Sequence, residues 1–167
     1  MGKCNDPVVI VEHAELFQNA GLMPTNDLDY CIPLGKAKVV RRGTACTVLA
    51  AATMVKAATE AAEETGIDAE VIDLRSLDPT GLDWPCIEAS VKRTNRIVVA
   101  EQTARGTSIG ARIVAELQTR VFDYLDHEIV RVTGGLAAPV VSKVLNQAAL
   151  AGQAEVARGL RAVMGIS

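Results

Sequence analysis

The segment Gly106-Thr-Ser-Ile-Gly110 has the residue types and spacing of a small anion site. It follows an apolar stretch expected to be a strand, and Ser108 is placed to cap the next helix. Free backbone N–H groups at a helix start attract anions, and ligands of parallel α/β proteins bind beyond the carboxyl ends of the strands. The sequence therefore predicts a ligand site formed by Glu101, Arg105, Thr107 and Ser108.

The same segment has a structural interpretation, which we favour. An ordinary strand-to-helix turn also needs glycine and a capping side chain. The segment matches neither the Gly-x-Gly-x-x-Gly turn nor the Walker P-loop. Asp73, Arg75 and Asp78, at the end of another expected strand, are likewise interpreted as a salt-bridged turn rather than as ligand-facing groups.

Neither the histidines nor the cysteines indicate a catalytic or metal centre. His13 and His127 each lie near acidic residues and are interpreted as surface histidines rather than general bases or metal ligands. The four cysteines form no Cys-x-x-Cys pair, so we expect neither zinc nor a disulfide framework. Cys46 and Cys86 are interpreted as core or near-core thiols in a reducing cytoplasm. With no Gly-x-Ser-x-Gly elbow and no visible nucleophile–base pair, we predict no catalytic residue.

A strand–helix–strand unit over residues 47–79 organises the chain. Residues 47–51 are an apolar run typical of a strand buried on both faces. Residues 54–65 place apolar side chains on one stripe of a helix, and Gly66 ends it. Residues 71–74 form the second strand, and a right-handed crossover makes the two strands parallel.

The remaining elements extend this unit. Strands are expected at residues 7–11, 36–42, 97–100 and 129–133, and residues 101–107 are expected to be a polar loop. Basic residues flanking 36–42 suit an edge strand. Helices are expected after Asp83, after Ser108 (burying Ile109, Ile113, Leu117 and Val121) and in two pieces beyond residue 142, broken at Gly152. The fold class is therefore α/β, a three-layer α/β/α sandwich around a mostly parallel sheet of about five strands.

Composition excludes several function classes. The 167 residues are 49% hydrophobic and 22% charged, which suits a packed core. Aromatic residues are only 3% and the net charge is −3, so we expect no nucleic-acid surface. No apolar run approaches the roughly 20 residues needed to span a bilayer, and no signal peptide is visible. We therefore expect a cytoplasmic chain without membrane contact.

Several runs resemble the C-terminal domain of the β subunits of 2-oxo acid dehydrogenase E1 components (pyruvate, branched-chain or acetoin type). They include Ile32-Pro-Leu-Gly-Lys-Ala-Lys-Val-Val-Arg-Arg-Gly-Thr44 and Ile67-Asp-Ala-Glu-Val-Ile-Asp-Leu-Arg-Ser-Leu-Asp-Pro79, followed by Ser90-Val-Lys-Arg-Thr94, Val98-Val-Ala-Glu101, Phe122-Asp-Tyr-Leu-Asp126 and Arg131-Val-Thr-Gly134. Pro7-Val-Val-Ile-Val-Glu-His13 resembles the last strand of the thiamine domain that precedes it in that family. The resemblance implies that residues 1–30 are strand and linker from a preceding thiamine domain. It also implies that residues 31–167 are a transketolase C-terminal-like domain, with a five-stranded mixed sheet whose first strand is antiparallel.

The family's enzymes use thiamine diphosphate and Mg²⁺, and the resemblance implies both for the full enzyme. The catalytic glutamate and the Gly-Asp-Gly diphosphate motif belong to other domains, so we expect this chain alone to bind neither cofactor nor metal. The resemblance further implies a homodimer, an E1 α-type subunit and an E2 acyltransferase as partners.

This chain departs from the family at positions that include subunit contacts. After the first core strand, the family has an aromatic residue or serine followed by glycine, whereas this chain has Ala51-Ala52. The glycine-rich start of the long helix reads Thr107-Ser-Ile-Gly-Ala-Arg112, and a proline-rich turn reads Leu136-Ala-Ala-Pro-Val140.

Two functions remain open, and an independent enzyme is disfavoured. The first is a subunit-assembly and docking domain of an E1 β subunit, supporting oxidative decarboxylation done elsewhere. The second is a free-standing regulatory module, or one that binds an anion or another small ligand, on the same fold, with the loop over residues 101–110 as its anion site.

Overall fold

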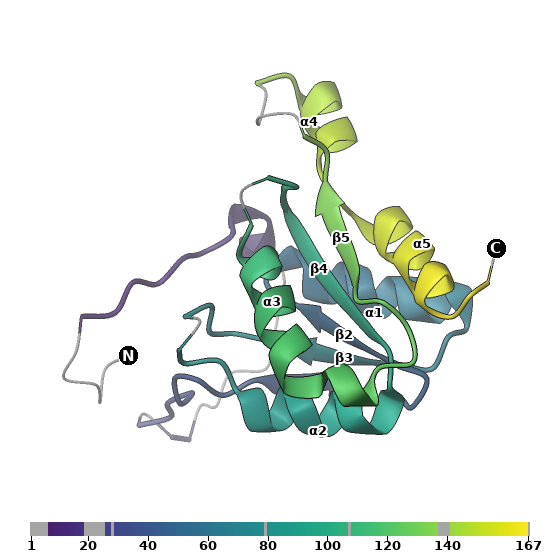
Figure 1. Ribbon diagram of the computed structural model, residues 1–167. Helices are drawn as coiled ribbons and strands as arrows, with labels where there is room; N and C mark the ends of the chain where they lie inside the picture. The colour runs from purple at the N-terminus through teal and green to yellow at the C-terminus, as the bar shows by residue number, and fades with distance from the viewer. Residues whose placement is uncertain are drawn as a thin grey trace.

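The computed structural model describes residues 7–18, 26–27, 29–78, 80–106, 108–136 and 141–166. Within them, five strands form one sheet in the order β1-β3-β2-β4-β5 (Figure 1). The strands are β1 (Lys38–Arg41), β2 (Cys46–Ala50), β3 (Ala69–Asp73), β4 (Ile97–Ala104) and β5 (Val130–Gly134). The α-helices are α1 (Thr53–Thr65), α2 (Trp84–Thr94), α3 (Ile109–Val121), α4 (Lys143–Ala149) and α5 (Gln153–Val163), and two 3₁₀ helices are η1 (Ala14–Gln18) and η2 (Phe122–Tyr124).

Strand β2 is the centre of the sheet. It pairs in parallel with β3 on one edge and with β4 on the other, and all five of its residues are buried. Successive side chains of a strand point to opposite faces, so this apolar run supplies both sides of the core. The parallel β2–α1–β3 unit and the α/β fold class expected from the sequence are confirmed.

Strand β1 lies at one edge of the sheet and runs antiparallel to β3, pairing Lys38 with Asp73 and Val39 with Ile72. It is the only strand of the described sheet that runs against its neighbour. The edge position and the antiparallel first strand are therefore as expected.

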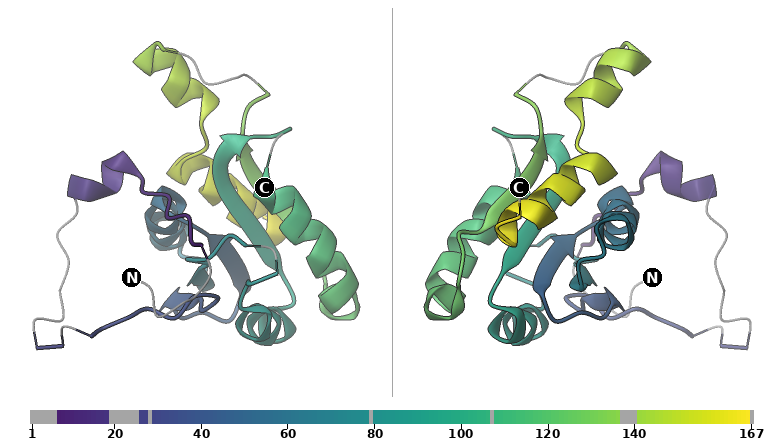
Figure 2. Two further views of the ribbon diagram at one scale, coloured as in Figure 1. Left: turned by 90° about the vertical axis from the view of Figure 1, so that its left-hand side faces the viewer. Right: turned by 90° about the vertical axis from the view of Figure 1, so that its right-hand side faces the viewer.

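Helices cover both faces of the sheet, which gives three layers (Figures 1 and 2). Helices α1 and α5 pack on one face through residues such as Ala58, Ala61 and Leu160. Helices α2 and α3 pack on the other face, and α2 begins with the single tryptophan, Trp84. The guanidinium carbon of Arg120 lies 4.4 Å from the centre of the Trp84 ring.

Local signals begin or end the helices where the sequence indicates. Gly66 follows α1 with φ 68°, a left-handed conformation that glycine adopts without strain. The Asp83 carboxylate accepts a hydrogen bond from the Cys86 backbone N–H and caps α2. Ser108 accepts one from the Ala111 N–H and caps α3.

No helix within the described residues is long and apolar enough to cross a membrane.

The structure differs from the sequence-based expectation in three places. Residues 7–11 form no strand and leave Val9 88% and Val11 85% exposed, because no strand in the described part of the chain lies beside them. Strand β4 continues to Ala104, since β5 pairs with it as far as Gly134, so residues 101–104 are strand rather than loop. Ile109 is 37% exposed, although the spacing predicts it to be buried.

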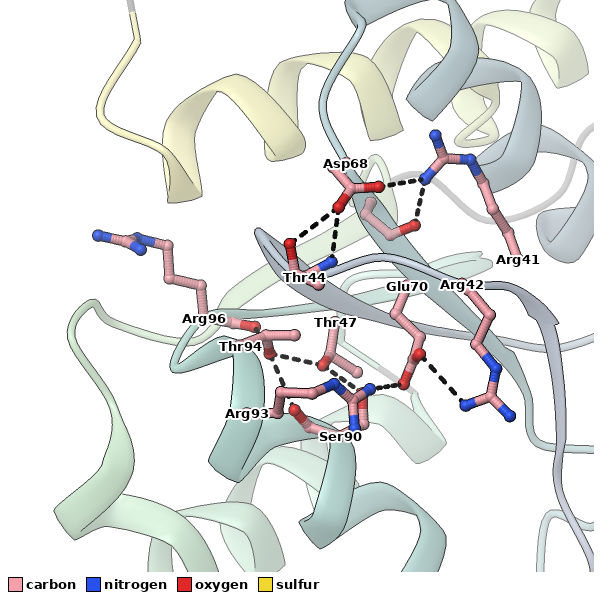
Figure 3. Close-up of polar contacts among 11 residues, drawn as sticks. Arg41, Arg42, Thr44, Thr47, Asp68, Glu70, Ser90, Arg93, Thr94 and Arg96 are labelled. Atoms are coloured by element: carbon pink, nitrogen blue, oxygen red, sulfur yellow. Dashed lines mark hydrogen bonds and ion pairs between the residues drawn. The ribbon is translucent and has the colours of Figure 1, made fainter.

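A buried carboxylate joins the sheet to the end of α2 at the amino-terminal side of the parallel strands (Figure 3). Glu70 on β3 is 2% exposed. It forms a short ion pair with Arg93 and a second pair with Arg42, where the nitrogen and oxygen are 3.6 Å apart. Isolated buried charge is costly, so Arg93 compensates the burial of Glu70.

A hydroxyl cluster and a surface turn lie beside this pair (Figure 3). The Thr47 hydroxyl lies 2.7 Å from both the Ser90 and the Thr94 hydroxyls, all of them buried. The Asp68 carboxylate accepts hydrogen bonds of 2.9 Å from the Thr44 hydroxyl and backbone N–H, which lower the pKa of Asp68. The hydroxyl contacts tie β2 to α2, and the Thr44–Asp68 bonds join the turn before β2 to the turn before β3.

We expect Arg93→Met to lower the free energy of unfolding by about 2 kcal/mol, because the buried Glu70 charge loses its nearest partner. Arg96→Met is the matched control: Arg96 pairs at 4.0 Å with Asp126, which is largely exposed, and this change should cost about 0.5 kcal/mol or less. Urea unfolding followed by circular dichroism measures both. Equal losses for the two variants would contradict the role given to Glu70.

Candidate functional site at the carboxyl end of the sheet

The chain leaves β2 and β4 in opposite directions at the carboxyl end of the sheet. From β2 it passes through α1 to β3 on one side, and from β4 through α3 to β5 on the other. The helices α1 and α3 also pack on opposite faces. Such a switch point is where open α/β sheets bind ligands.

A cavity of about 320 Å³ lies at this switch point. Its apolar lining comes from β2, β4, the segments that directly follow β2 and β3, and the first turns of α1 and α3: Leu49, Ala51, Ala52, Met54, Leu74, Leu77, Val99, Ala100, Ile109, Gly110 and Ile113. Its polar lining consists of His13, Thr53, Glu101, Gln102 and Thr103.

The Glu101 carboxylate lies at the start of α3. It accepts a hydrogen bond from the Gly110 backbone N–H at 3.0 Å and a short one from the Ser108 hydroxyl. A carboxylate there is favoured by the partial positive charge of a helix N-terminus. An added Cβ on Gly110 would lie 2.4 Å from a Glu101 oxygen, so only glycine allows this approach.

Arg131 on β5 neutralises this carboxylate. Its Nη2 atom donates to Glu101 at 3.2 Å, to the Ser108 hydroxyl at 2.8 Å and to the Arg105 carbonyl at 3.3 Å. Arg131 is directly opposite Val99 in the β4–β5 ladder, close to Glu101. Arg131 is not among the site residues predicted from the sequence, where the available signal is a lone arginine within an apolar strand.

The structure brings together part of the predicted ligand site. Glu101 and Ser108 bond to each other, whereas Arg105 is exposed and contributes a backbone carbonyl. Thr107 lies outside the described residues. The anion site stays a prediction, and an anion at the start of α3 would have to displace the Glu101 carboxylate from the Gly110 N–H.

His13 is not the surface histidine that the sequence suggests. It is partly buried, and its Nε2 atom lies 3.1 Å from the Gln102 side-chain oxygen. The same oxygen accepts a 3.4 Å hydrogen bond from the Thr53 hydroxyl. The chain just before η1 is thereby attached to β4. His127, in contrast, contacts only the carbonyl of its neighbour Glu128 among the described polar contacts.

Ala52 connects β2 to α1 in a strained conformation. Its φ of 51° and ψ of −129° lie in a region that side chains with a Cβ rarely adopt. Such strain costs of order 1–3 kcal/mol and is concentrated at functional sites. Ala52 lines the cavity, so the strained turn and the cavity are parts of one feature.

The other candidate groups are structural. Asp73 and Arg75 form a salt-bridged turn, with 3.9 Å between their charged atoms, and Asp78 accepts hydrogen bonds from Thr80. The salt-bridged turn expected from the sequence is confirmed for Asp73 and Arg75, whereas the partner of Asp78 is the neighbouring Thr80. Within the described residues, no group of three His, Cys, Asp or Glu side chains could hold a metal ion.

Cys46 and Cys86 lie in or near the core, as expected, whereas Cys31 is exposed. Burial raises the pKa of the Cys46 thiol to about 12. Burial, and then the Asp83 carboxylate, raise the pKa of Cys86 as well. Raised pKa values disfavour the nucleophilic thiolate.

The sequence profile of a known family, described as "Transketolase, C-terminal domain", matches residues 35–156. The chain belongs to this family. It is 50% identical over 105 residues to the 2-oxoisovalerate dehydrogenase subunit beta of Pseudomonas aeruginosa, covering 63% of this chain and 29% of that protein. It is 34% identical over 161 residues to the pyruvate dehydrogenase E1 component subunit beta of Rhizobium meliloti, covering 95% and 34%.

A solved structure titled "Split gene transketolase, inactive beta4 tetramer" shares the fold. Its TM-score is 0.64 at 22% identity, over 88% of this chain and 47% of that chain. The resemblance to E1 β subunits expected from the sequence is thus confirmed. This transketolase C-terminal domain spans about a third of the length of the curated relatives that it matches.

We expect Ala52→Gly to raise the free energy of unfolding by about 1 kcal/mol, because glycine adopts positive φ without strain. Ala51→Gly is the control. Ala51 has no positive φ, and this change should lower stability by roughly 0.5–1 kcal/mol through unfolded-chain entropy. Urea unfolding of both variants provides the comparison. A loss of stability in both would show that the Ala52 turn is unstrained.

We expect iodoacetamide at pH 8 to modify Cys31 in the native chain and to leave Cys46 unmodified, because Cys46 is buried and protonated. Peptide mapping by mass spectrometry reports each thiol. In urea both should react at similar rates. Equally fast native labelling of the two thiols would contradict the raised pKa.

Proposed function

We propose that this chain is the subunit-assembly and docking domain of a thiamine-diphosphate-dependent 2-oxo acid dehydrogenase E1 β subunit. Support comes from relatives named as β subunits of 2-oxoisovalerate and pyruvate dehydrogenases. On this proposal, oxidative decarboxylation with thiamine diphosphate and Mg²⁺ takes place on other domains. This chain supplies contacts to a second copy, to an E1 α-type subunit and to an E2 acyltransferase.

The observation that most supports an assembly role is the apolar surface of α4 and its flanks. Helix α4 stands away from the sheet at the end of β5 (Figures 1 and 2). Val144 is 75% exposed and Leu145 60%, and the flanking Leu136 and Val141 are 83% and about fully exposed. Large apolar groups gathered on a projecting segment are typical of a protein–protein interface.

A second apolar segment lies at the other end of the chain. Residues 7–11 are extended and outside the sheet (Figure 1), and Val8, Val9, Ile10 and Val11 are 45–88% exposed. An apolar extended segment can add to the edge of another sheet. This supports contact with a preceding domain or another subunit.

A free-standing anion-binding module is the alternative, and it has less support. Glu101 already accepts a hydrogen bond from the Gly110 N–H at the start of α3, with Arg131 beside it. The Gly110 N–H that would attract an anion is therefore already paired within the chain, and the Nε atom of Arg131 is the buried donor of this cluster that has no hydrogen-bond partner among the described residues.

We expect the purified chain to sediment as a dimer, unchanged by thiamine diphosphate and Mg²⁺. Val144→Asp with Leu145→Asp should shift it toward monomer, since charge in an apolar interface is strongly unfavourable. Ala115→Asp with Gln118→Asp places the same two charges on exposed positions of α3 and is the control. Analytical ultracentrifugation measures all three chains.

A chain that is monomeric at every concentration, and that is not retained by an E1 α-type subunit in co-purification, would rule out the assembly role. A cofactor-dependent shift in sedimentation would instead mean that this chain binds thiamine diphosphate itself.

A further inference from the structure

We propose that the cavity at the β2–β4 switch point binds a small neutral molecule with an aliphatic body and one hydrogen-bonding head group. The proposal does not depend on the assembly role. It follows from the size of the cavity, the distribution of its polar groups and the pairing of its charges.

The cavity walls suit an aliphatic body. Leu49, Val99 and Ile113 are at most 3% exposed and line the cavity, and Leu74, which directly follows β3, is 4% exposed. At about 320 Å³ the volume is near the lower limit of ligand pockets, which are roughly 300–1,000 Å³. The ligand is therefore small.

Small side chains at the end of β2 leave this space open. Ala51 and Ala52 follow the strand directly and both line the cavity. A longer side chain at residue 51 would therefore occupy part of the cavity. The backbone at Ala52 keeps its positive φ at the edge of this cavity, although a conformation without this strain would be more stable.

The polar groups suit a single head group. His13, Thr53 and Gln102 come from three separate segments, and the first two both contact the Gln102 side-chain oxygen. The hydroxyl of Thr53 and the amide of Gln102 can donate and accept hydrogen bonds without a charge, and the His13 ring supplies a further hydrogen-bonding nitrogen. An alcohol or amide head group is complementary to them.

The charges exclude a charged head group. Glu101 is the one carboxylate among the described residues that line the cavity. Its charge is compensated by Arg131 at 3.2 Å and by the Gly110 N–H and Ser108 hydroxyl. A carboxylate or ammonium ligand would lose its hydration without gaining an unpaired counter-charge, which is unfavourable.

The ligand would also hold the N-terminal segment on the sheet. His13 directly precedes η1, whereas the rest of the lining comes from the sheet, from the segments after β2 and β3, and from helices α1 and α3. A molecule between these parts contacts both. Binding should therefore slow amide hydrogen exchange in residues 12–18.

Three probes with the same chain length test the head group: hexanamide, hexan-1-ol and hexanoate. We expect the two neutral probes to bind the full chain, with chemical-shift changes at Ala51, Val99 and Gln102, and hexanoate to bind about tenfold more weakly. Binding curves from ¹⁵N–¹H spectra give the dissociation constants. Failure of both neutral probes to bind, or equal binding of hexanoate, overturns the proposal.

Two variants and a control locate the site. Ala51→Leu fills the cavity and should weaken hexanamide binding about tenfold or more. Gln102→Leu removes the hydrogen-bonding group and should reduce hexanamide affinity by a similar factor. Ala115→Leu is the same alanine-to-leucine substitution on the exposed face of α3, and it should alter hexanamide affinity by no more than about twofold. Unchanged affinity in Ala51→Leu, with native spectra, places the probe elsewhere and overturns the assignment.

Discussion

Strand β2 has a parallel partner on each edge and a layer of helices over each face, so none of its five residues reaches water. Its amide groups must all be paired within the sheet, because a buried unpaired amide is costly. The neighbours β3 and β4 are therefore required on both sides, and the chain must leave β2 and β4 in opposite directions to reach the remaining strands. The divergence of these two connections produces the cavity.

The features that the sequence predicts correctly depend on signals within a few residues. Gly66, Asp83 and Ser108 each end or begin a helix by contacts with their own turn. The errors depend on partners distant in sequence. Residues 7–11 are apolar enough for a strand but have no strand beside them, and β4 passes Glu101 because β5 continues to pair with it. The contact of His13 with Gln102 spans 89 residues, and no local pattern indicates it.

In the candidate site, too, the local contacts could be predicted from the sequence and the partners distant in sequence could not. The strand-to-helix turn places Glu101 and Ser108 near each other, and the sequence is sufficient to locate that turn. Which groups they bind depends on Arg131, brought alongside by the β4–β5 register. The carboxylate therefore interacts with both the helix start and the guanidinium, while the Nε atom of Arg131 is buried without a hydrogen-bond partner among the described residues. The start of α3 therefore does not depend on an ion from solution.

The position of Trp84 makes the two helical layers spectroscopically unequal. It is the only tryptophan, it packs with α2 and α3, and Arg120 lies over its ring. Tryptophan emission therefore reports the environment on one face of the sheet, while the α1–α5 layer on the other face contributes none. Partial opening of that second layer would be silent in fluorescence and visible in far-ultraviolet circular dichroism, so a difference between the two transition curves would identify which layer separates first.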